Sequence, residues 1–144
     1  MKAFAFKLEK LLKLRRYREQ ETEISLGRET GRLSAIEARI KLIAGEKKAA
    51  AAERFAKNNG ARDIITIDNY MLRLEQTKEN LLQAAAKQEL LVEEARAVFL
   101  EASRERKIID KLKDRRAAEY RAFYLREETK TIDDISSSSR QRNY

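Results

Sequence analysis

Lysine and arginine are the residues of this chain whose number and spacing suggest a chemical role, and they gather in two places. Residues 1–20 carry seven Lys or Arg against two Glu, and residues 104–116 carry seven against three acids. These two segments, at +5 and +4, together exceed the net charge of +8 of the whole chain, so the remaining residues are close to neutral. Clustered basic side chains attract phosphates or acidic protein surfaces.

The chain contains no His and no Cys. It therefore lacks the commonest acid–base group and metal ligand, as well as any thiolate. A zinc site of Cys and His ligands, a Ser-His-Asp triad and a Cys-His pair cannot be built from this chain alone. We expect no enzymatic activity, no catalytic residue, no metal site and no cofactor.

The amino-terminal residues MKAFAFKLEKLLKLRR lack the uninterrupted apolar stretch of a signal peptide, because they are charged at Lys7, Glu9, Lys10 and Lys13. No segment has the apolar length of a transmembrane helix. The absence of cysteine is compatible with a reducing compartment. These features predict a soluble, cytoplasmic protein.

Two long segments rich in Ala, Leu, Glu, Lys and Arg must position the basic clusters. They are separated by Lys57–Asp68, in which Asn58, Asn59 and Gly60 suit positive φ and predict a helix C-cap. The candidate N-caps of the second segment are Asp63, Thr66 and Asp68.

We expect an all-α fold, a long antiparallel two-helix coiled-coil hairpin over residues 1–135. Helix one is predicted at about 4–57, the turn at about 58–66 and helix two at about 67–134. Residues 136–144, SSSSRQRNY, have no apolar period and are predicted to be a disordered tail. The alternative is one continuous helix that forms a parallel dimer.

Apolar residues in steps of three and four predict the seam of each helix. In helix one they are Leu26, Leu33, Ile36, Ile40, Ile43 and Ala50. In helix two they are Tyr70, Leu74, Thr77, Leu81, Ala84, Gln88, Leu91, Ala95, Val98, Ala102, Glu105, Ile109 and Leu112. The polar members Gln88 and Glu105 are interpreted as fixing the register.

A shorter apolar face stands at the amino terminus, made of Phe4, Leu8, Leu11 and Leu12 with lysines on its flanks. The preferred interpretation is the start of the seam. An amphipathic helix on a membrane surface is the alternative.

Folding about the turn places Ile43 opposite Leu81, Leu26 opposite Val98 and Leu12 opposite Leu112. It also sets the two basic segments side by side. Further apolar residues near this end cannot all face one partner helix: Phe99, Leu100, Ile108, Tyr120, Phe123, Tyr124 and Leu125. An acidic protein surface is the favoured partner, and nonspecific binding of nucleic acid or of an acidic membrane is the alternative.

Both ends of the chain resemble the FliJ family of flagellar type III export proteins. The opening FAFKLEKLLKLRRYREQETEISLG is similar to the family's amino-terminal pattern of a Phe, a Leu-rich turn and an Arg before a Glu-rich helix. The segment ERKIIDKLKDRRAAEYRAFYLREETKTIDDI is similar to its carboxyl-terminal pattern. That pattern is matched by Arg106–Lys107, Leu112, Arg115–Arg116, Tyr120 and Asp133–Asp134.

The resemblance implies an antiparallel coiled coil like the stalk helices of the ATP synthase γ subunit. It implies partners as well: a hexameric flagellar export ATPase, the cytoplasmic domain of the export gate protein and export chaperones. The expected site is cytoplasmic, peripheral at the inner membrane at the flagellar base, with no nucleic acid bound.

The resemblance also assigns contact residues. The ATPase-docking residues would be Leu8, Leu11, Arg15, Arg18, Arg106, Lys107, Leu112 and Arg116, with electrostatic and apolar roles. For the export-gate contact the resemblance points to Tyr70, and Met71 and Leu72 are the alternative contact residues.

Overall fold

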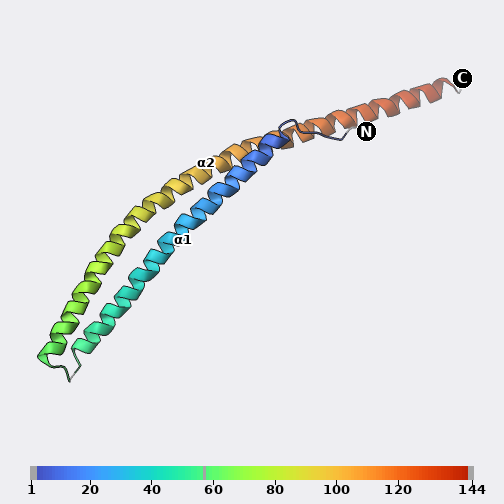
Figure 1. Cartoon of the computed structure of the whole chain (residues 1–144). Helices are drawn as coiled ribbons and strands as arrows, with labels where there is room; N and C mark the ends of the chain where they lie inside the picture. The colour runs from blue at the N-terminus through green and yellow to red at the C-terminus, as the bar shows by residue number, and fades with distance from the viewer. Residues whose placement is uncertain (1–2, 57, 143–144) are drawn as a thin grey trace. The chain divides into compact units, whose positions relative to one another are not determined.

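The computed structural model describes residues 3–56 and 58–142 of the chain. It consists of two long helices that pack against each other, α1 (Glu9–Arg54) and α2 (Ala61–Gln141). Figure 1 shows the two helices running in opposite directions from the turn between them. The prediction of an all-α fold is confirmed, and the chain does not form one continuous helix.

The chain divides into two compact units, and both helices take part in each of them. One unit comprises residues 1–19 and 101–144, and it is called the terminal unit here. The other comprises Gln20–Leu100 and is called the hairpin unit.

In the hairpin unit, the turn is closed by side chains rather than by a left-handed backbone. No described residue has a positive φ, so the predicted use of that conformation at Asn58–Gly60 is wrong. Instead, the Asn59 amide donates hydrogen bonds to the carbonyl oxygens of Glu53 (2.5 Å) and Arg54 (3.3 Å). It thus bonds two carbonyls of the last turn, of which that of Glu53 also accepts the Ala56 N–H, and α1 ends at Arg54.

Helix α2 begins at Ala61, earlier than the predicted residue 67. Gly60 precedes it, and the Gly60 backbone N–H donates to the Asp63 carboxylate at 3.2 Å. This is half of a capping box, in which the third helical residue reaches back to the N-cap. Of the candidate N-caps, Asp63 therefore acts from inside the helix, while Thr66 donates to the Arg62 carbonyl and Asp68 pairs with Arg54.

The predicted seam of helix one is confirmed. All six of its residues are buried or half-buried, and Ile43 and Ala50 are the most deeply covered. In helix two, nine of the thirteen predicted residues are buried or half-buried: those at 74, 81, 84, 88, 95, 102, 105, 109 and 112. The other four, Tyr70, Thr77, Leu91 and Val98, are exposed, and the residues one position later, Met71, Lys78, Val92 and Phe99, are covered instead.

Gln88 is one of the buried polar residues, and it is bonded across the helix pair. Its amide donates to the Glu29 carbonyl oxygen at 3.0 Å and to the Glu29 carboxylate at 2.6 Å. Two ion pairs, Lys47–Glu75 and Arg54–Asp68, also join α1 to α2 in this unit. They lie at positions where an antiparallel register brings opposite charges together.

In the terminal unit, α1 begins at Glu9 rather than at residue 4, and residues 3–6 are not helical. Leu12 donates the first full helical hydrogen bond, to the Leu8 carbonyl oxygen at 2.9 Å. Phe4, predicted to be on the helical face, instead packs against Tyr120 of α2, with ring centroids 5.7 Å apart. Leu12 is fully buried between the helices.

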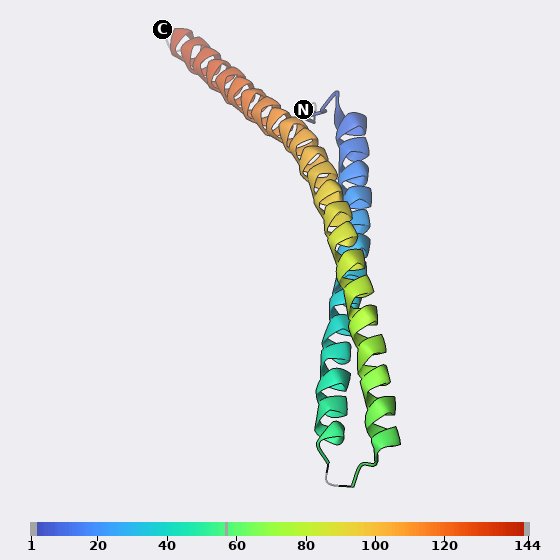
Figure 2. The ribbon, with the colours of Figure 1, turned by 90° about the vertical axis from the view of Figure 1, so that its left-hand side faces the viewer.

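Helix α2 continues past the start of α1 (Figure 2), and every described residue beyond Tyr124 is exposed. The predicted disorder from residue 136 is not shown, since α2 ends at Gln141. No glycine or proline follows Gly60 to stop the helix. The serine hydroxyls bond back along it, Ser137 to the Asp133 carbonyl and Ser139 to the Ile135 carbonyl, both at 2.8 Å. Residues 143 and 144 of the predicted tail lie outside the described residues.

Candidate docking surface on the terminal unit

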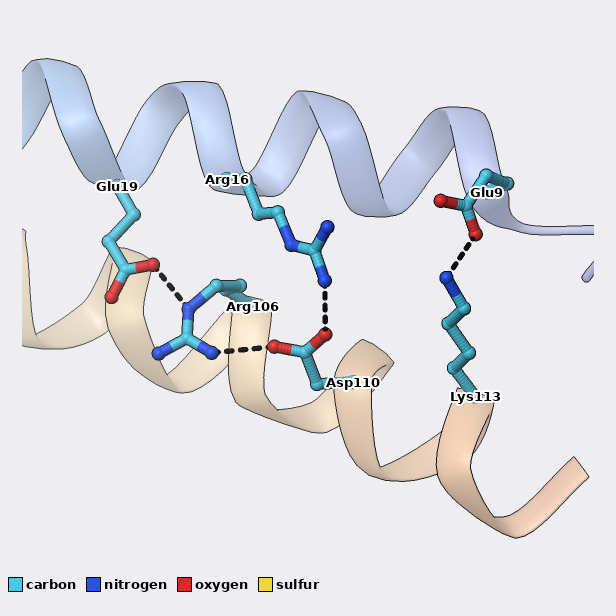
Figure 3. A network of polar contacts seen from close by, with 6 residues as sticks. All are labelled: Glu9, Arg16, Glu19, Arg106, Asp110 and Lys113. Carbon is cyan, nitrogen blue, oxygen red and sulfur yellow. Dashed lines mark hydrogen bonds and ion pairs between the residues drawn. The ribbon is translucent and has the colours of Figure 1, made fainter. Parts of the chain in front are cut away.

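A network of ion pairs joins the start of α1 to α2 in the terminal unit (Figure 3). Arg106 is its centre: its Nε donates to the Glu19 carboxylate, and its Nη1 donates to Asp110 at 2.5 Å. Asp110 also accepts from Arg16 at 3.1 Å. Arg106 thus bonds one carboxylate on each helix and holds the two together.

Two further ion pairs extend the network along the helices. Lys113 contacts Glu9 at 2.8 Å, and Arg15 donates to Glu105 at 2.5 Å. Glu105, predicted as a polar seam residue, therefore bonds directly to the opposite helix. Pairs of this kind fix the rotation and register of two helices, because the charges meet in one alignment.

The electrostatics of the network favour its charged form. The hydrogen bond from Arg106 lowers the pKa of Asp110 below its ordinary value of 3.8; burial opposes this change and Arg16 adds to it. Lys113 likewise lowers the pKa of Glu9. The pKa of Arg106 is raised by Glu19 first and by Asp110 second. These shifts follow from hydrogen bonding and attraction between opposite charges.

Most acids of the two basic segments are engaged in ion pairs between the helices, whereas many of their bases are exposed to solvent. The two basic segments hold five acids, and Glu9, Glu19, Glu105 and Asp110 are all paired across the helices, so Asp114 is the fifth. Several exposed bases of these segments form no ion pair within the described residues: Lys7, Lys10, Lys13, Arg18, Lys107 and Lys111. The outward surface of the two basic segments is therefore strongly basic.

An apolar groove of about 780 Å³ lies beside this basic surface. Its walls are the non-helical residues 3–8 and the α2 residues Leu112, Tyr120 and Phe123. Tyr120 also packs against Tyr124, with ring centroids 6.1 Å apart. Lys7 and Arg116 stand at the groove together with Glu119, so the groove offers apolar walls and a mixed, mainly basic rim.

The structure divides the predicted ATPase-docking residues into three groups. Arg15 and Arg106 are half-buried in the ion-pair network. Leu8 and Leu112 line the groove, and Leu11 is half-buried. Arg18, Lys107 and Arg116 are exposed, although Arg116 contacts Glu119 on its own helix at 3.1 Å.

The acids of the network and the Phe4–Tyr120 contact were not predicted as site residues. The predicted antiparallel pairing contains a signal for the acids, since it places Glu19 near Arg106 and Glu9 near Lys113. The sequence contains no such signal for the Phe4–Tyr120 contact, because the predicted helix starting at residue 4 would place the Phe4 ring at a different position.

The predicted export-gate residues lie in the hairpin unit and do not share one face. Met71 is half-buried in the seam, whereas Tyr70 and Leu72 are exposed by 39% and 72%. Successive helical residues are about 100° apart, so Tyr70 and Leu72 stand on either side of Met71.

Among the described residues, no group of three or more acids, His or Cys is placed to hold a metal ion. Neither helix has, within the part of the chain that was described, an apolar stretch that could cross a membrane.

Comparison with known families finds one match that covers nearly the whole chain. Residues 4–143 match the family described as flagellar FliJ protein. Comparisons with curated proteins and with solved structures find no significant match.

Proposed function

We propose that this chain, which belongs to the flagellar FliJ protein family, docks into the hexameric flagellar export ATPase through its terminal unit. Members of the family are structural components of flagellar protein export and are not known as enzymes. The protein would act as a helical rod that links the ATPase to the export gate and to export chaperones. It would work in the cytoplasm, peripherally at the inner membrane at the flagellar base.

The composition of the terminal unit's surface is the observation that supports docking. Pairing between the helices engages four of the five acids of the two basic segments, while Arg18 and Lys107 are exposed and form no ion pair within the described residues. A basic rim steers an acidic partner and orients it. The apolar groove formed by residues 3–8 and α2 then supplies contact area that does not depend on charge.

Co-sedimentation with the cognate ATPase tests this proposal. Arg18→Glu combined with Lys107→Glu should weaken binding about tenfold or more, equivalent to roughly 1.4 kcal/mol. The matched control is Lys41→Glu with Lys48→Glu, which makes the same charge change on exposed residues of the hairpin unit. Equal binding by both variants would contradict docking through the terminal unit.

Arg106 is a poor residue for that test. Its reversal would break contacts with Glu19 and Asp110 inside the protein, so a loss of binding would not distinguish a missing contact from a loosened terminal unit. Lys107, its neighbour, is exposed and carries no such contact.

The contact with the export gate is proposed for the exposed Tyr70 side of α2. A pull-down with the cytoplasmic domain of the gate protein should lose signal on Tyr70→Ala and keep it on Leu90→Ala. Leu90 serves as control because it is an exposed apolar residue elsewhere on α2, by 66%. Retention by both variants would place the gate contact elsewhere.

The rival function, nonspecific binding of nucleic acid or acidic membrane, is favoured by the same exposed bases. It predicts retention of duplex DNA or anionic vesicles at physiological salt, with a steep loss as salt rises. Such retention, together with no binding to the ATPase, would replace the docking proposal.

A further inference from the structure

Helix α2 has a second apolar stripe beside the one that α1 covers. Ala84, Leu91 and Val98 are seven residues apart and therefore lie along one line of the helix. The seam residues at 85, 92 and 99 face α1, whereas Leu91 and Val98 are exposed by 45% and 51%. The apolar face of α2 is thus wider than α1 can bury.

A small hollow identifies which residues of α1 border this stripe. It measures about 190 Å³ and is lined by Glu21, Thr22 and Ser25 of α1 and by Ala95 and Val98 of α2. Steps of seven residues from Glu21 lead along α1 to Arg28, Ala35 and Leu42. The same steps from Ser25 lead to Arg32 and Arg39. We call the surface formed by Ala35, Leu42, Ala84, Leu91 and Val98 the central groove.

The middle of the central groove's rim is mainly basic. Arg28 and Arg39 are exposed and form no ion pair within the described residues, and Arg32 contacts only Glu29 on its own helix. On α2, Lys87 lies on the same side of the helix. Glu94, seven residues later, is an acid of α2 on this side. Acids of α1 lie at both ends of the groove: Glu21 at one end, and Glu46, the next step of seven after Arg39, at the other.

The opposite side of the hairpin unit has the reverse character. Along the same stretch it carries Glu37 of α1 and Glu79, Glu89 and Glu93 of α2, against Lys41 and Arg96. The near-neutral middle of the chain is therefore divided lengthwise by charge into a basic side and an acidic side, and both sides expose apolar residues, Leu82 and Leu100 on the acidic one. A partner recognised by the basic side must be acidic.

We propose that the central groove binds an amphipathic helix of a partner protein, whose apolar stripe packs on Leu91 and Val98 and whose flanks carry Asp or Glu. A third helix laid beside two others is a standard way to bury an exposed heptad stripe. A second copy docking by the same groove would bring the arginines of both copies together, which is repulsive. The site lies in the hairpin unit and does not depend on docking by the terminal unit.

A designed peptide tests the proposal on the full-length protein. The probe is a labelled helix of about three heptads with Leu at both seam positions and Glu at the flanking positions. A control peptide keeps each Leu and replaces each Glu by Lys. Fluorescence anisotropy should report binding of the acidic peptide, and binding of the basic peptide should be at least about tenfold weaker.

Variants locate the binding on the protein. Leu91→Ser with Val98→Ser should weaken binding of the acidic peptide by at least about tenfold, because two apolar contacts are lost. The matched control is Leu82→Ser with Leu100→Ser, which alters two exposed apolar residues away from the groove, exposed by 44% and 47%. Arg28→Glu with Arg39→Glu should also weaken binding, and Lys41→Glu with Lys48→Glu should not. Circular dichroism of each variant checks that the helices persist.

Three results would overturn the proposal: no binding of the acidic peptide, equal binding of both peptides, or binding that the groove variants leave unchanged. Sedimentation of the protein alone shows whether a second copy of the chain occupies the groove. A dimer abolished by Leu91→Ser with Val98→Ser would mean that a second copy, rather than an acidic helix of another protein, occupies the groove.

Discussion

Arg106 bonds carboxylates on both helices of the terminal unit, Glu19 on α1 and Asp110 on α2. Its side chain is only 26% exposed, so the contacts are partly shielded from water. Arg106→Ala should lower the free energy of unfolding by about 1 kcal/mol, because both acids lose a charged partner. Urea denaturation followed by circular dichroism measures the change.

The control for Arg106 is its near neighbour Arg104. That side chain is 73% exposed and contacts Glu101 on its own helix at 3.6 Å. Arg104→Ala should change the free energy of unfolding by less than about 0.5 kcal/mol. A similar loss in both variants would show that the contacts between the helices are no stronger than surface pairs.

Asp110 should make stability depend on pH. Its pKa is lowered in the folded protein, by Arg106 above all. A lowered folded pKa contributes stability above the unfolded pKa, and this contribution is lost as the pH falls through the folded pKa. Stability should therefore decline as the pH drops below the ordinary value of 3.8.

Comparison of unfolding at neutral and acidic pH measures this effect. Asp110→Asn should be less stable than the wild type at neutral pH and should show a shallower decline in acid. Asp114→Asn is the control, since Asp114 is exposed and forms no ion pair within the described residues. Parallel pH profiles for the wild type and Asp110→Asn would contradict the assignment.

At the scale of the elements, three glycines within α1 have no packing role. A Cβ built at Gly27, Gly31 or Gly45 meets no atom within 4 Å, and no glycine has a positive φ. Glycine in a helix interior costs about 1 kcal/mol relative to alanine, mainly through backbone entropy. Gly31→Ala should therefore raise the free energy of unfolding by up to about 1 kcal/mol.

The three glycine-to-alanine variants can be compared by thermal unfolding. Thermal unfolding of the single variants Gly27→Ala, Gly31→Ala and Gly45→Ala should give a higher midpoint in each case. A lower midpoint for any variant would contradict the prediction. It would mean that the added methyl group clashes in solution with an atom that does not belong to this folded chain.

Much of the architecture could be predicted from the spacing of apolar residues. The antiparallel pairing and the α1 seam follow from heptads interrupted by a turn. The rotation of α2 could not be predicted, because Leu91 and Val92, like Val98 and Phe99, are adjacent apolar residues. Either residue of each adjacent pair fits a seam of period 3.5, and only the packing of α1 against α2 determines which one is buried.

The candidate site was predictable as a concentration of charge but not as an arrangement. Arg18 and Lys107 are exposed as a docking role requires, whereas Arg15 and Arg106 contact acids of the opposite helix. Which bases pair and which remain outside depends on helix rotation and register together. Residue counts do not contain that information.

At the scale of the whole molecule, charge is unevenly distributed between the two units. The two basic segments of the terminal unit carry the chain's excess of positive charge, and the rest is close to neutral. Binding of the proposed ATPase partner should weaken as salt rises from about 0.1 M to about 1 M, because the screening length shortens from about 10 Å to about 3 Å. Sedimentation at a series of salt concentrations measures this.

A control separates the charged contribution from the apolar one. The variant Arg18→Glu with Lys107→Glu should show a weaker salt dependence than the wild type, since fewer attractive charges remain to be screened. Salt-independent binding of the wild type would mean that the apolar groove at residues 3–8 alone carries the interaction.

The exposed end of α2 has a consequence for turnover in the cell. Every described residue beyond Tyr124 is exposed, and the hydroxyl groups of Thr131 and Ser137 donate to carbonyl oxygens of their own helix. A short isolated helix in water opens readily, so its amide protons should exchange with solvent much faster than those around Ile43. A protease would find its first cleavage points here, and a bound partner covering this end would lengthen the protein's lifetime.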